Sequence, residues 1–349
     1  MLISICIPHY NRSKYLLLVL DSIKIQDYPN IEVIVSDDCS TDDSLTVIPQ
    51  YIAKQEGKCL IRYIRQERNL GYDGNLRASL SAAHGDYLFI LGNDDALPQA
   101  DTISQLVGIL KRLHSPDIAF ANFHLYGREE QVIRRALNTV LIGSGPDVAV
   151  KTFRSFSFFG GIVIKRTAFR EHDTSAYDGS IYFQIYLAAR IVSSGGSLAS
   201  ISESLVAKDV QFQGETANTY LDVLVRDNQK QTPKTGGLDQ VGRVACDAIL
   251  PYIPTAKRGK YILSIYRQLF FYSYPYWLYD YRKNGVFRAA VNLALGCFPG
   301  NLIRIKEVPL SVHVYLLIVY IAITSAGLLV PIRFLEKIKG TVYRLSKSV

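Results

Sequence analysis

Short apolar runs alternate with stretches of helical spacing through the first half of the chain. The first run, residues 2–8, is rich in β-branched side chains and stops at a proline, and the apolar positions of residues 13–25 then recur with the period of an amphipathic helix. Similar apolar runs begin at Ile31, Leu60 and Tyr87. Because helical patterns separate these runs, the sequence predicts an α/β fold, with a mostly parallel sheet and helices on both faces.

Each predicted strand is followed at once by a polar cluster. The clusters comprise residues 9–12, 36–42, 68–75 and 93–95. In open α/β sheets, ligands bind at the carboxyl ends of the strands. Since the clusters occupy those positions, we expect them to meet at one edge of the sheet and to form a single site.

The last of these clusters contains two adjacent carboxylates, Asp94 and Asp95, directly after an apolar run. A hard divalent cation such as Mg²⁺ or Mn²⁺ prefers oxygen ligands and leaves part of its coordination shell to water and substrate phosphates. The pair therefore predicts a metal site and a phosphate-bearing substrate. The competing interpretation is a simple turn, because Asn and Asp favour turns through local hydrogen bonds.

The strands and clusters together resemble successive blocks of the family 2 glycosyltransferases. The blocks read SICIPHYNR at residues 4–12, VSDDCSTD at 35–42, NLG at 69–71 and GDYLFILGNDD at 85–95. They occur in the family's order, over the first third of the chain. The resemblance implies a Rossmann-like fold of the GT-A type, a nucleotide-diphosphate-sugar donor, Mg²⁺ or Mn²⁺, and inversion at the transferred sugar carbon.

The resemblance also implies which residues bind the donor. They are Pro8, Tyr10, Arg12, Asp38, Asn69, Gly71 and Asp94. The first three correspond to the lining of the nucleobase pocket, and Asp38 corresponds to the residue that accepts a hydrogen bond from the base. The alternative for Asp38 is that it belongs, with Asp37 and Asp42, to a cluster that caps a helix.

Asp94 and Asp95 fall on the metal and ribose positions of the family. The usual signature of this loop begins with an aspartate two residues before Asp94, where this chain has Gly92. Two carboxylates remain, and they suffice for one ion bridged to pyrophosphate oxygens.

Glycosyl transfer also needs a base that removes the proton of the acceptor hydroxyl. Residues 158–166 resemble the glycine-containing strand on the acceptor side of the family, and a helical pattern follows at 185–192. Between them, Asp178 is the best-placed carboxylate and Asp173 is the second candidate. The Glu-Asp pair usual at this position is absent, and a helix-capping role for Asp178 is the alternative.

Two further resemblances concern the donor. Residues 179–184 resemble the abequosyltransferase-like and other O-antigen branches of the family, which suggests a deoxysugar donor. Lys208 falls where the family often carries a basic residue near the leaving phosphate, and an ordinary surface lysine is the alternative.

The net charge of +8 is compatible with nucleic-acid binding, but the sequence contains no arginine-rich or RNA-binding aromatic motif, so no nucleic-acid partner is expected. The five cysteines form no paired motif and favour a reducing compartment. The apolar start of the chain is too short, and lacks the basic leader, for a secretory signal.

The composition changes in the C-terminal third. Residues 261–279 are dense in aromatic side chains and are flanked by lysines and arginines, a pattern that favours a lipid headgroup interface. The alternative is the core of a helical subdomain. The sequence thus predicts a glycosyltransferase domain over residues 1–215, a helical, aromatic-rich membrane-interface region over 216–300, and a hydrophobic membrane segment with a basic tail over 301–349.

Residues 308–332 carry no charged side chain and are long enough to cross a bilayer. Basic residues on both sides, more numerous after the segment, place the tail in the cytoplasm by the positive-inside rule. A buried helix of a soluble fold is one alternative, disfavoured by the basic flanks. Because the catalytic domain must meet nucleotide-sugar in the cytoplasm too, two membrane arrangements stay open. One is a single span, and the other is a hairpin that breaks near residues 324–327, followed by an amphipathic surface helix at 332–345.

These features predict a metal-dependent, inverting glycosyltransferase at the cytoplasmic face of a bacterial inner membrane. It would add one sugar to a polyprenyl-linked glycan during surface polysaccharide assembly. A processive synthase is the alternative among enzymes, disfavoured because no Gln-x-x-Arg-Trp block is present and one span is too few for an export channel. A catalytically weak membrane scaffold that keeps the donor-binding fold is the alternative from another class.

Overall fold

The computed structural model of the chain describes residues 1–54, 59–217, 238–299 and 308–337. The chain divides into two compact units, Met1–Asn218 and Thr219–Val349. We describe each unit by itself. The domain limits predicted at residues 215 and 300 stay predictions.

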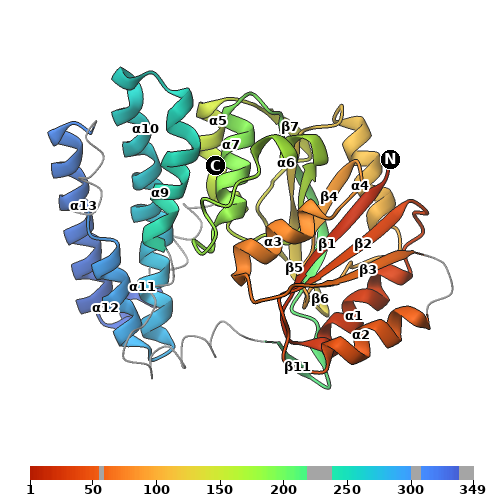
Figure 1. Ribbon diagram of the computed structural model, residues 1–349. Helices are drawn as coiled ribbons and strands as arrows, with labels where there is room; N and C mark the ends of the chain where they lie inside the picture. Colours follow the sequence, from red (N-terminus) through yellow and green to blue (C-terminus); the bar gives the residue numbers. More distant parts are fainter. Residues whose placement is uncertain (55–58, 218–237, 300–307, 338–349) are drawn as a thin grey trace. The chain divides into compact units, whose positions relative to one another are not determined.

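A nine-stranded sheet forms the centre of the first unit (Figure 1). Its strands are β1 (Ile3–His9), β2 (Ile31–Asp37), β3 (Leu60–Arg65), β4 (Tyr87–Ile90), β5 (Ile118–Leu125), β6 (Arg128–Ile133), β7 (Val140–Gly143), β8 (Ile162–Lys165) and β9 (Leu198–Lys208). The order is β3-β2-β1-β4-β8-β5-β9-β7, and β6 pairs with β5. The pairs among β3, β2, β1 and β4 are parallel, whereas β8 runs antiparallel to both neighbours. The predicted mostly parallel α/β sheet is therefore confirmed.

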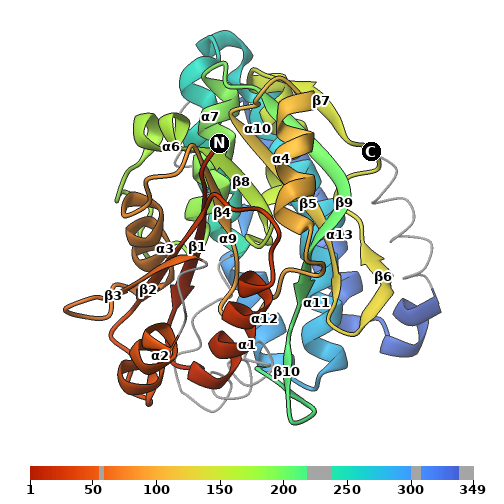
Figure 2. The same ribbon diagram turned by 90° about the vertical axis from the view of Figure 1, so that its right-hand side faces the viewer.

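Helices cover both faces of this sheet (Figures 1 and 2). They are α1 (Ser13–Lys24), α2 (Ser44–Ala53), α3 (Gly71–Ser81), α4 (Thr102–Arg112), α5 (Pro146–Thr152), the 3₁₀ helix η1 (Phe153–Phe156), α6 (Arg166–His172) and α7 (Phe183–Ser193). A small hairpin of β10 (Gln211–Phe212) and β11 (Glu215–Thr216) ends the unit. Helices α1, α2 and α4 contribute to the core on one face, and α3 packs on β1 and β2 from the other.

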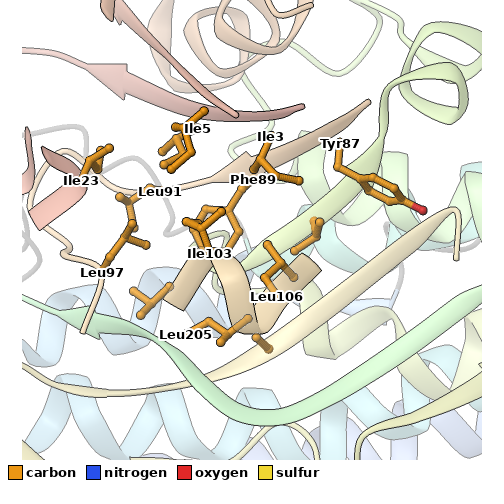
Figure 3. Close-up of a cluster of buried hydrophobic side chains, with 14 of the residues drawn as sticks. Ile3, Ile5, Ile23, Tyr87, Phe89, Leu91, Leu97, Ile103, Leu106 and Leu205 are labelled. Atoms are coloured by element: carbon orange, nitrogen blue, oxygen red, sulfur yellow. The ribbon is translucent and has the colours of Figure 1, made fainter. Parts of the chain in front are cut away.

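The core follows from the alternation of side chains along the strands. Ile3 and Ile5 of β1 and Phe89 of β4 point to the same face, where they meet Ile103 and Leu106 of α4 (Figure 3). All five are fully buried. Burial of one such side chain contributes roughly 1.5–3 kcal/mol, so this face holds β1 and β4 in place and fixes the edge at which their polar loops emerge.

Two elements differ from the sequence prediction in their bounds. Helix α3 begins at Gly71, inside the polar cluster predicted at residues 68–75, because the Asp38 carboxylate accepts hydrogen bonds from the amides at that helix start. The strand expected over residues 158–166 is confirmed only as β8, residues 162–165. Gly161, with φ +76°, lies in the left-handed region, so the backbone before it leaves the strand direction.

The second unit is helical in the residues that the structure describes. It contains α9 (Leu238–Ile249), the 3₁₀ helix η2 (Leu250–Tyr252), α10 (Thr255–Gln268), the π-helix η3 (Leu269–Ser273), α11 (Tyr274–Lys283), α12 (Phe287–Gly296) and α13 (Leu310–Leu329). Because α10, η3 and α11 follow one another without a gap, residues 255–283 form one helical rod with a π-helical segment. All five cysteines of the chain are free thiols.

Helix α13 is continuous, so the break predicted near residues 324–327 is wrong. Packing explains this continuity. A Cβ atom on Gly327 would lie 2.6 Å from Leu278, so the glycine allows a close approach of two helices rather than a turn. The Thr324 hydroxyl pairs with the hydroxyl of Tyr274 at 2.7 Å. Among the described residues, α13 is the one helix long and apolar enough to cross a membrane, and 11% of its apolar window is buried.

Some predicted features lie outside the described residues. The basic residues expected before the apolar segment, Arg304 and Lys306, belong to this group, as does most of the amphipathic helix predicted over 332–345, which the structure describes only to residue 337. They stay predictions.

Candidate active site

Asp38 links the ends of β1 and β2 to the start of α3. Its backbone N–H donates to the carbonyl oxygen of His9 at 2.8 Å, and its buried carboxylate accepts from the amides of Leu70 and Gly71, the latter at 3.0 Å. Burial raises the pKa of the Asp38 carboxyl, and the two amide donors oppose this shift. Asp38 thus caps α3 in this structure, and its predicted role toward a nucleobase stays a prediction.

Asn69 completes this corner of the site. Its side-chain amide donates to the carbonyl oxygen of Asp38 at 3.2 Å, and its Oδ1 accepts from the amide of Gly71 at 3.0 Å. Gly71 has φ +75°, a conformation that favours glycine. The structure therefore brings the predicted donor residues Asp38, Asn69 and Gly71 together at one helix start.

His9 connects the end of β1 to the loop after β4. The Asn93 side chain lies 3.1 Å from His9 Nδ1, and Ser44 Oγ lies 2.8 Å from Nε2. Burial lowers the pKa of His9 to about 4, so the ring is neutral at pH 7. Because the Asn93 amide is a donor, the proton of the neutral ring resides on Nε2 and points to Ser44.

Arg12 joins the predicted nucleobase side of the site to the carboxylate loop. It lies at the start of α1 with φ 69°, and its Nη1 is 2.6 Å from Asp94 Oδ2 and 3.3 Å from Asn93 Oδ1. Tyr10 is 44% exposed beside it, and Pro8 is partly buried within β1. The side chain of Arg12 is therefore a cation beside the carboxylate loop, where a phosphate-bearing substrate is predicted.

The end of β9 docks on the same loop. Ala96 and Ala207 form a β-bridge, the Val210 amide donates to the Asp94 carbonyl at 2.8 Å, and the Asp209 amide donates to Asp95 Oδ1 at 3.2 Å. Lys208 forms an ion pair with Asp209. The structure thus brings Lys208 beside the carboxylate pair, together with Asp209, which our sequence analysis did not select.

Asp95 lies deep in the protein, whereas Asp94 reaches the surface. Asp95 is 2% exposed, and the side chain of Asp94 is 18% exposed. Burial, with the Asp94 carboxylate as the second cause, raises the pKa of Asp95 to about 8, and burial also raises the pKa of Asp94. A cation close to both groups would oppose these shifts.

The residues fit a hard cation as a partial ligand set. Asp94 and Asp95 supply carboxylate oxygens of the kind that Mg²⁺ and Mn²⁺ prefer. In the described part of the chain, no group of three or more His, Cys, Asp or Glu side chains is placed to hold a metal ion. A cation held by Asp94 and Asp95 alone would take its remaining ligands from substrate or water.

The position of Asp95 explains Gly92, the departure from the family signature. A Cβ atom on Gly92 would lie 2.5 Å from Asp95 Oδ2, closer than real Cβ contacts come. A Cβ on Gly160 would approach the same oxygen to 3.1 Å. The carboxylate of Asp95 therefore lies in space that two glycines leave open, and an aspartate at position 92 does not fit this arrangement.

The two candidate bases share one arginine. Arg77 Nη1 lies 2.9 Å from Asp178 Oδ2, and Arg77 Nε lies 2.8 Å from Asp173 Oδ1. Arg77 Nη2 makes a second, longer contact to Asp173 Oδ2 at 3.4 Å. Asp178 lines a pocket of about 420 Å³, with Arg68, Asn69, Leu70, Gly74 and Arg77. Asp178 and Asn69, a predicted donor residue, therefore face one cavity.

Asp73, another residue that sequence analysis did not select, caps α7 from within α3. It is fully buried, and its carboxylate accepts from the amides of Ile181 and Phe183 at 2.6 and 3.1 Å. The capping role considered for Asp178 is therefore wrong, because Asp73 takes the amides at that helix start. Asp178 instead contacts Arg77 and lines the pocket.

A family model for glycosyl transferase family 2 matches residues 4–173. The N-terminal unit belongs to this family. The match includes the Asp38 corner, the Asp94 loop and Arg77, and it ends at Asp173, so it does not reach Asp178.

Curated family 2 relatives align with parts of the chain. The abequosyltransferase RfbV of Salmonella typhimurium is 46% identical over 99 residues, 28% of this chain and 29% of its own length. A GalNAc(5)-diNAcBac-PP-undecaprenol beta-1,3-glucosyltransferase of Campylobacter jejuni is 35% identical over 96 residues, 27% of this chain and 30% of its own. The poly(ribitol-phosphate) beta-N-acetylglucosaminyltransferase TarS of Staphylococcus aureus is 27% identical over 201 residues, 54% of this chain and 33% of its own. The chain therefore aligns with a third or less of each relative.

The family 2 fold also appears in solved structures. The crystal structure of S. aureus TarS in complex with UDP-GlcNAc superposes with a TM-score of 0.61 at 17% sequence identity, over 94% of this chain and 90% of that one. At this identity the likeness concerns the fold, and it confirms the predicted GT-A architecture.

One partly buried arginine shapes the wall beside Asp95. The Arg135 guanidinium donates to the carbonyl oxygens of Ala121, Ser155, Phe158 and Gly160. It also lies over the rings of Phe123 and Phe158, with its Cζ atom 5.3 and 5.4 Å from the centroids. These contacts hold the turn at residues 158–161. No signal in the sequence marks Arg135, because its partners are backbone carbonyls far away in the chain.

Proposed function

We propose that this chain is a glycosyltransferase that moves one sugar from a nucleotide-diphosphate-sugar to a hydroxyl group of a glycan, with inversion at the sugar carbon. The observation that carries the proposal is the shared cavity of Asp178 and Asn69. Asn69 belongs to the corner of Asp38 and Gly71, where donor binding is predicted. A base and a donor site on one cavity are what sugar transfer requires.

On the donor side, Pro8, Tyr10 and Arg12 receive the nucleotide, together with the corner of Asp38. Two cations lie beside the carboxylate loop. Arg12 pairs with Asp94, and Lys208 pairs with Asp209, whose amide donates to Asp95. These two cations suit the negative charge of a pyrophosphate. The family supports this assignment, because the related TarS structure holds UDP-GlcNAc.

Asp94 and Asp95 would hold a divalent metal, Mg²⁺ or Mn²⁺, on the donor side, with Asp95 the more deeply buried ligand. When bound, the ion supplies positive charge to the pyrophosphate that leaves. Arg12 then has two roles, since it pairs with Asp94 and also orients the donor phosphates.

On the acceptor side, Asp178 is the base and Asp173 is its support. Asp173 binds Arg77 through both of its oxygens, whereas Asp178 makes one contact to Arg77 and lines the cavity. An acceptor hydroxyl in the cavity gives its proton to Asp178, and its oxygen forms a bond to the anomeric carbon. The bond from that carbon to the pyrophosphate breaks, and the electron pair leaves with the pyrophosphate oxygen.

The acceptor that we propose is a lipid-linked glycan at the cytoplasmic face of a bacterial membrane. One relative's name contains a PP-undecaprenol acceptor, and another is an abequosyltransferase. The apolar helix α13 supports membrane association. A processive synthase is a weaker proposal, because in the described part of the chain only α13 has the length and composition of a span.

The test is a panel of nucleotide-sugars incubated with the full chain and Mg²⁺ or Mn²⁺, with release of the nucleoside diphosphate as the readout. We expect slow, metal-dependent hydrolysis of one donor without acceptor, and faster release when a lipid-linked glycan is added. Binding of a donor by calorimetry without any release would favour the scaffold instead. That alternative draws its support from Gly92 and from the partial metal-ligand set.

A further inference from the structure

Helix α13 and the rod of residues 255–283 run side by side in the same direction. Gly259 meets Pro309 at one end, where a Cβ atom would lie 2.8 Å from the proline ring. At the other end, Arg282 Nη1 donates to the carbonyl oxygen of Val330 at 2.8 Å. The two helices are therefore parallel, and α13 lies beside the rod over its whole length.

One stripe of α13 is fixed by specific contacts. The Tyr320 ring stacks on Tyr274 of the rod, with centroids 6.0 Å apart, and its hydroxyl donates to the carbonyl oxygen of Ala294 in α12 at 2.7 Å. Leu316 and Gly327 are buried on the same stripe. Figure 1 shows α13 in blue alongside α11 and α12. Because of these contacts, α13 is part of a helical bundle and not a separate segment.

The opposite face of α13 is exposed and mostly apolar, with Ser325 as an exposed polar residue on the same line. Val314, Ile318 and Ile321 are 49, 62 and 53% exposed, and Leu310 and Leu329 at the two ends are each 78% exposed. Spacings of three, four and eight residues align these positions on one side of a helix. With a rise of 1.5 Å per residue the face is about 30 Å long, and contiguous apolar surface of that extent marks a contact site.

Basic residues gather at both ends of this face. Lys257, Arg258 and Lys260 surround Gly259 at the Pro309 end, and Arg282, Lys283, Arg333 and Lys337 lie near the Val330 end. Among the described residues at these ends, acidic side chains are fewer, and Glu336, one of them, lies 3.7 Å from Lys283. An apolar face between basic groups is complementary to the acyl region and anionic headgroups of a bilayer, where each basic residue contributes about 1 kcal/mol.

We propose that the second unit docks on an anionic bilayer through the outer face of α13, with this helix lying in the membrane plane and not crossing it. The inference rests on the membrane association in the proposed function and specifies its geometry. This arrangement differs from both the single span and the hairpin that the sequence analysis left open.

Charged groups at the level of α13 argue against a span. The Arg267 guanidinium of the rod is exposed and lies 6.0 Å from the ring centroid of Tyr315, the sixth residue of α13. The exposed ion pair of Arg243 and Asp247 in α9 adjoins Gly242, which packs on Tyr266 of the rod. Insertion of α13 across the bilayer would carry its attached bundle along. These charges would then enter or approach the hydrocarbon, where charged side chains are unfavourable.

The first test is flotation of the full chain with vesicles of phosphatidylcholine, with and without phosphatidylglycerol. We expect binding that needs the anionic lipid, and a loss of at least about tenfold for Ile318→Asp or Val314→Asp, since burial of one aliphatic side chain is worth roughly 1.5–3 kcal/mol. Leu60→Asp is the matched control, because Leu60 is 63% exposed on β3, against 62% for Ile318. Thermal unfolding establishes that each variant is folded.

The second test measures depth. Tryptophan replaces Leu310, Ile318 or Leu329 in a Trp277→Phe background, and quenching by brominated lipids reports how deep each one lies. An in-plane helix gives similar depths at the three positions, whereas a span gives a much deeper Ile318 site. Three results would each overturn the inference. They are an Ile318 site much deeper than the other two, binding to vesicles without anionic lipid, and a loss of binding in Leu60→Asp equal to that in Ile318→Asp. Donor hydrolysis is measured on the same samples to separate the two proposals. A protein that docks on vesicles but hydrolyses no donor would contradict the proposed enzyme activity and leave the docking inference intact.

Discussion

Arg77 Nη1 lies 2.9 Å from Asp178 Oδ2, and both residues line the cavity that the predicted donor residue Asn69 also lines. The same guanidinium binds Asp173, whose two oxygens it contacts from the other side. In the proposed mechanism Arg77 is therefore a positioning residue, because its guanidinium binds Asp178 and Asp173 at once and so restricts the direction of the Asp178 carboxylate.

The Asp178→Asn variant should lose transfer by about 10²–10⁴-fold, the usual contribution of a positioned base. Its affinity for the nucleoside diphosphate should stay near that of wild type, which calorimetry measures. Asp173→Asn is the matched control, with an expected loss of about tenfold or less, because only the support of Arg77 changes. Normal transfer by Asp178→Asn with a large loss in Asp173→Asn would exchange the two roles.

The Asp94→Asn variant should lose metal-supported turnover, because a neutral amide balances the charge of a divalent ion poorly. Asp95→Asn should have an equal or milder effect. The measurement is donor hydrolysis as a function of Mg²⁺ or Mn²⁺ concentration. Wild-type rates in Asp94→Asn at limiting metal would remove the metal assignment.

The Asp38→Ala variant should raise the Michaelis constant for the donor more than it lowers kcat, because a contact to the nucleobase is common to the ground state and the transition state. It should also destabilise the protein by about 1 kcal/mol, since it removes a helix cap, as measured by urea denaturation. A defect confined to kcat would place Asp38 outside nucleotide binding.

The first four strands and the polar loops that follow them were predictable from the sequence, because apolar periodicity and the alternation of strands with helices along the chain determine them locally. The cluster of Asp38, Asn69 and Gly71 was predictable for the same reason, since each residue follows a strand. Asp73, Arg77 and Asp209 were not, because their partners lie about 100 residues away in the chain and only the fold brings them together.

The Gly92→Ala variant tests the explanation of the family departure at this position. The new Cβ would meet Asp95 Oδ2 at 2.5 Å, so the carboxylate must move, at a cost of about 1–3 kcal/mol typical of overpacking. Gly108→Ala on α4 is the control, because a Cβ there meets no atom within 4 Å and a helical alanine is favourable. Comparison of the two unfolding free energies gives the result, and equal stability of both variants would contradict the clash.

The stability of the protein should fall as the pH drops from about 6.5 to 4, in part through His9. Burial lowers the pKa of His9 to about 4, whereas Asp37, Asp42 and Arg12 are the charged groups that act on it. Between the two pKa values the unfolded chain binds a proton that the native state excludes, so stability rises with pH over this window. The full contribution is about 3 kcal/mol. Urea denaturation across this pH range should show a shallower dependence of stability on pH for His9→Asn than for wild type. An unchanged slope in His9→Asn would mean that other groups carry the acid sensitivity of the fold.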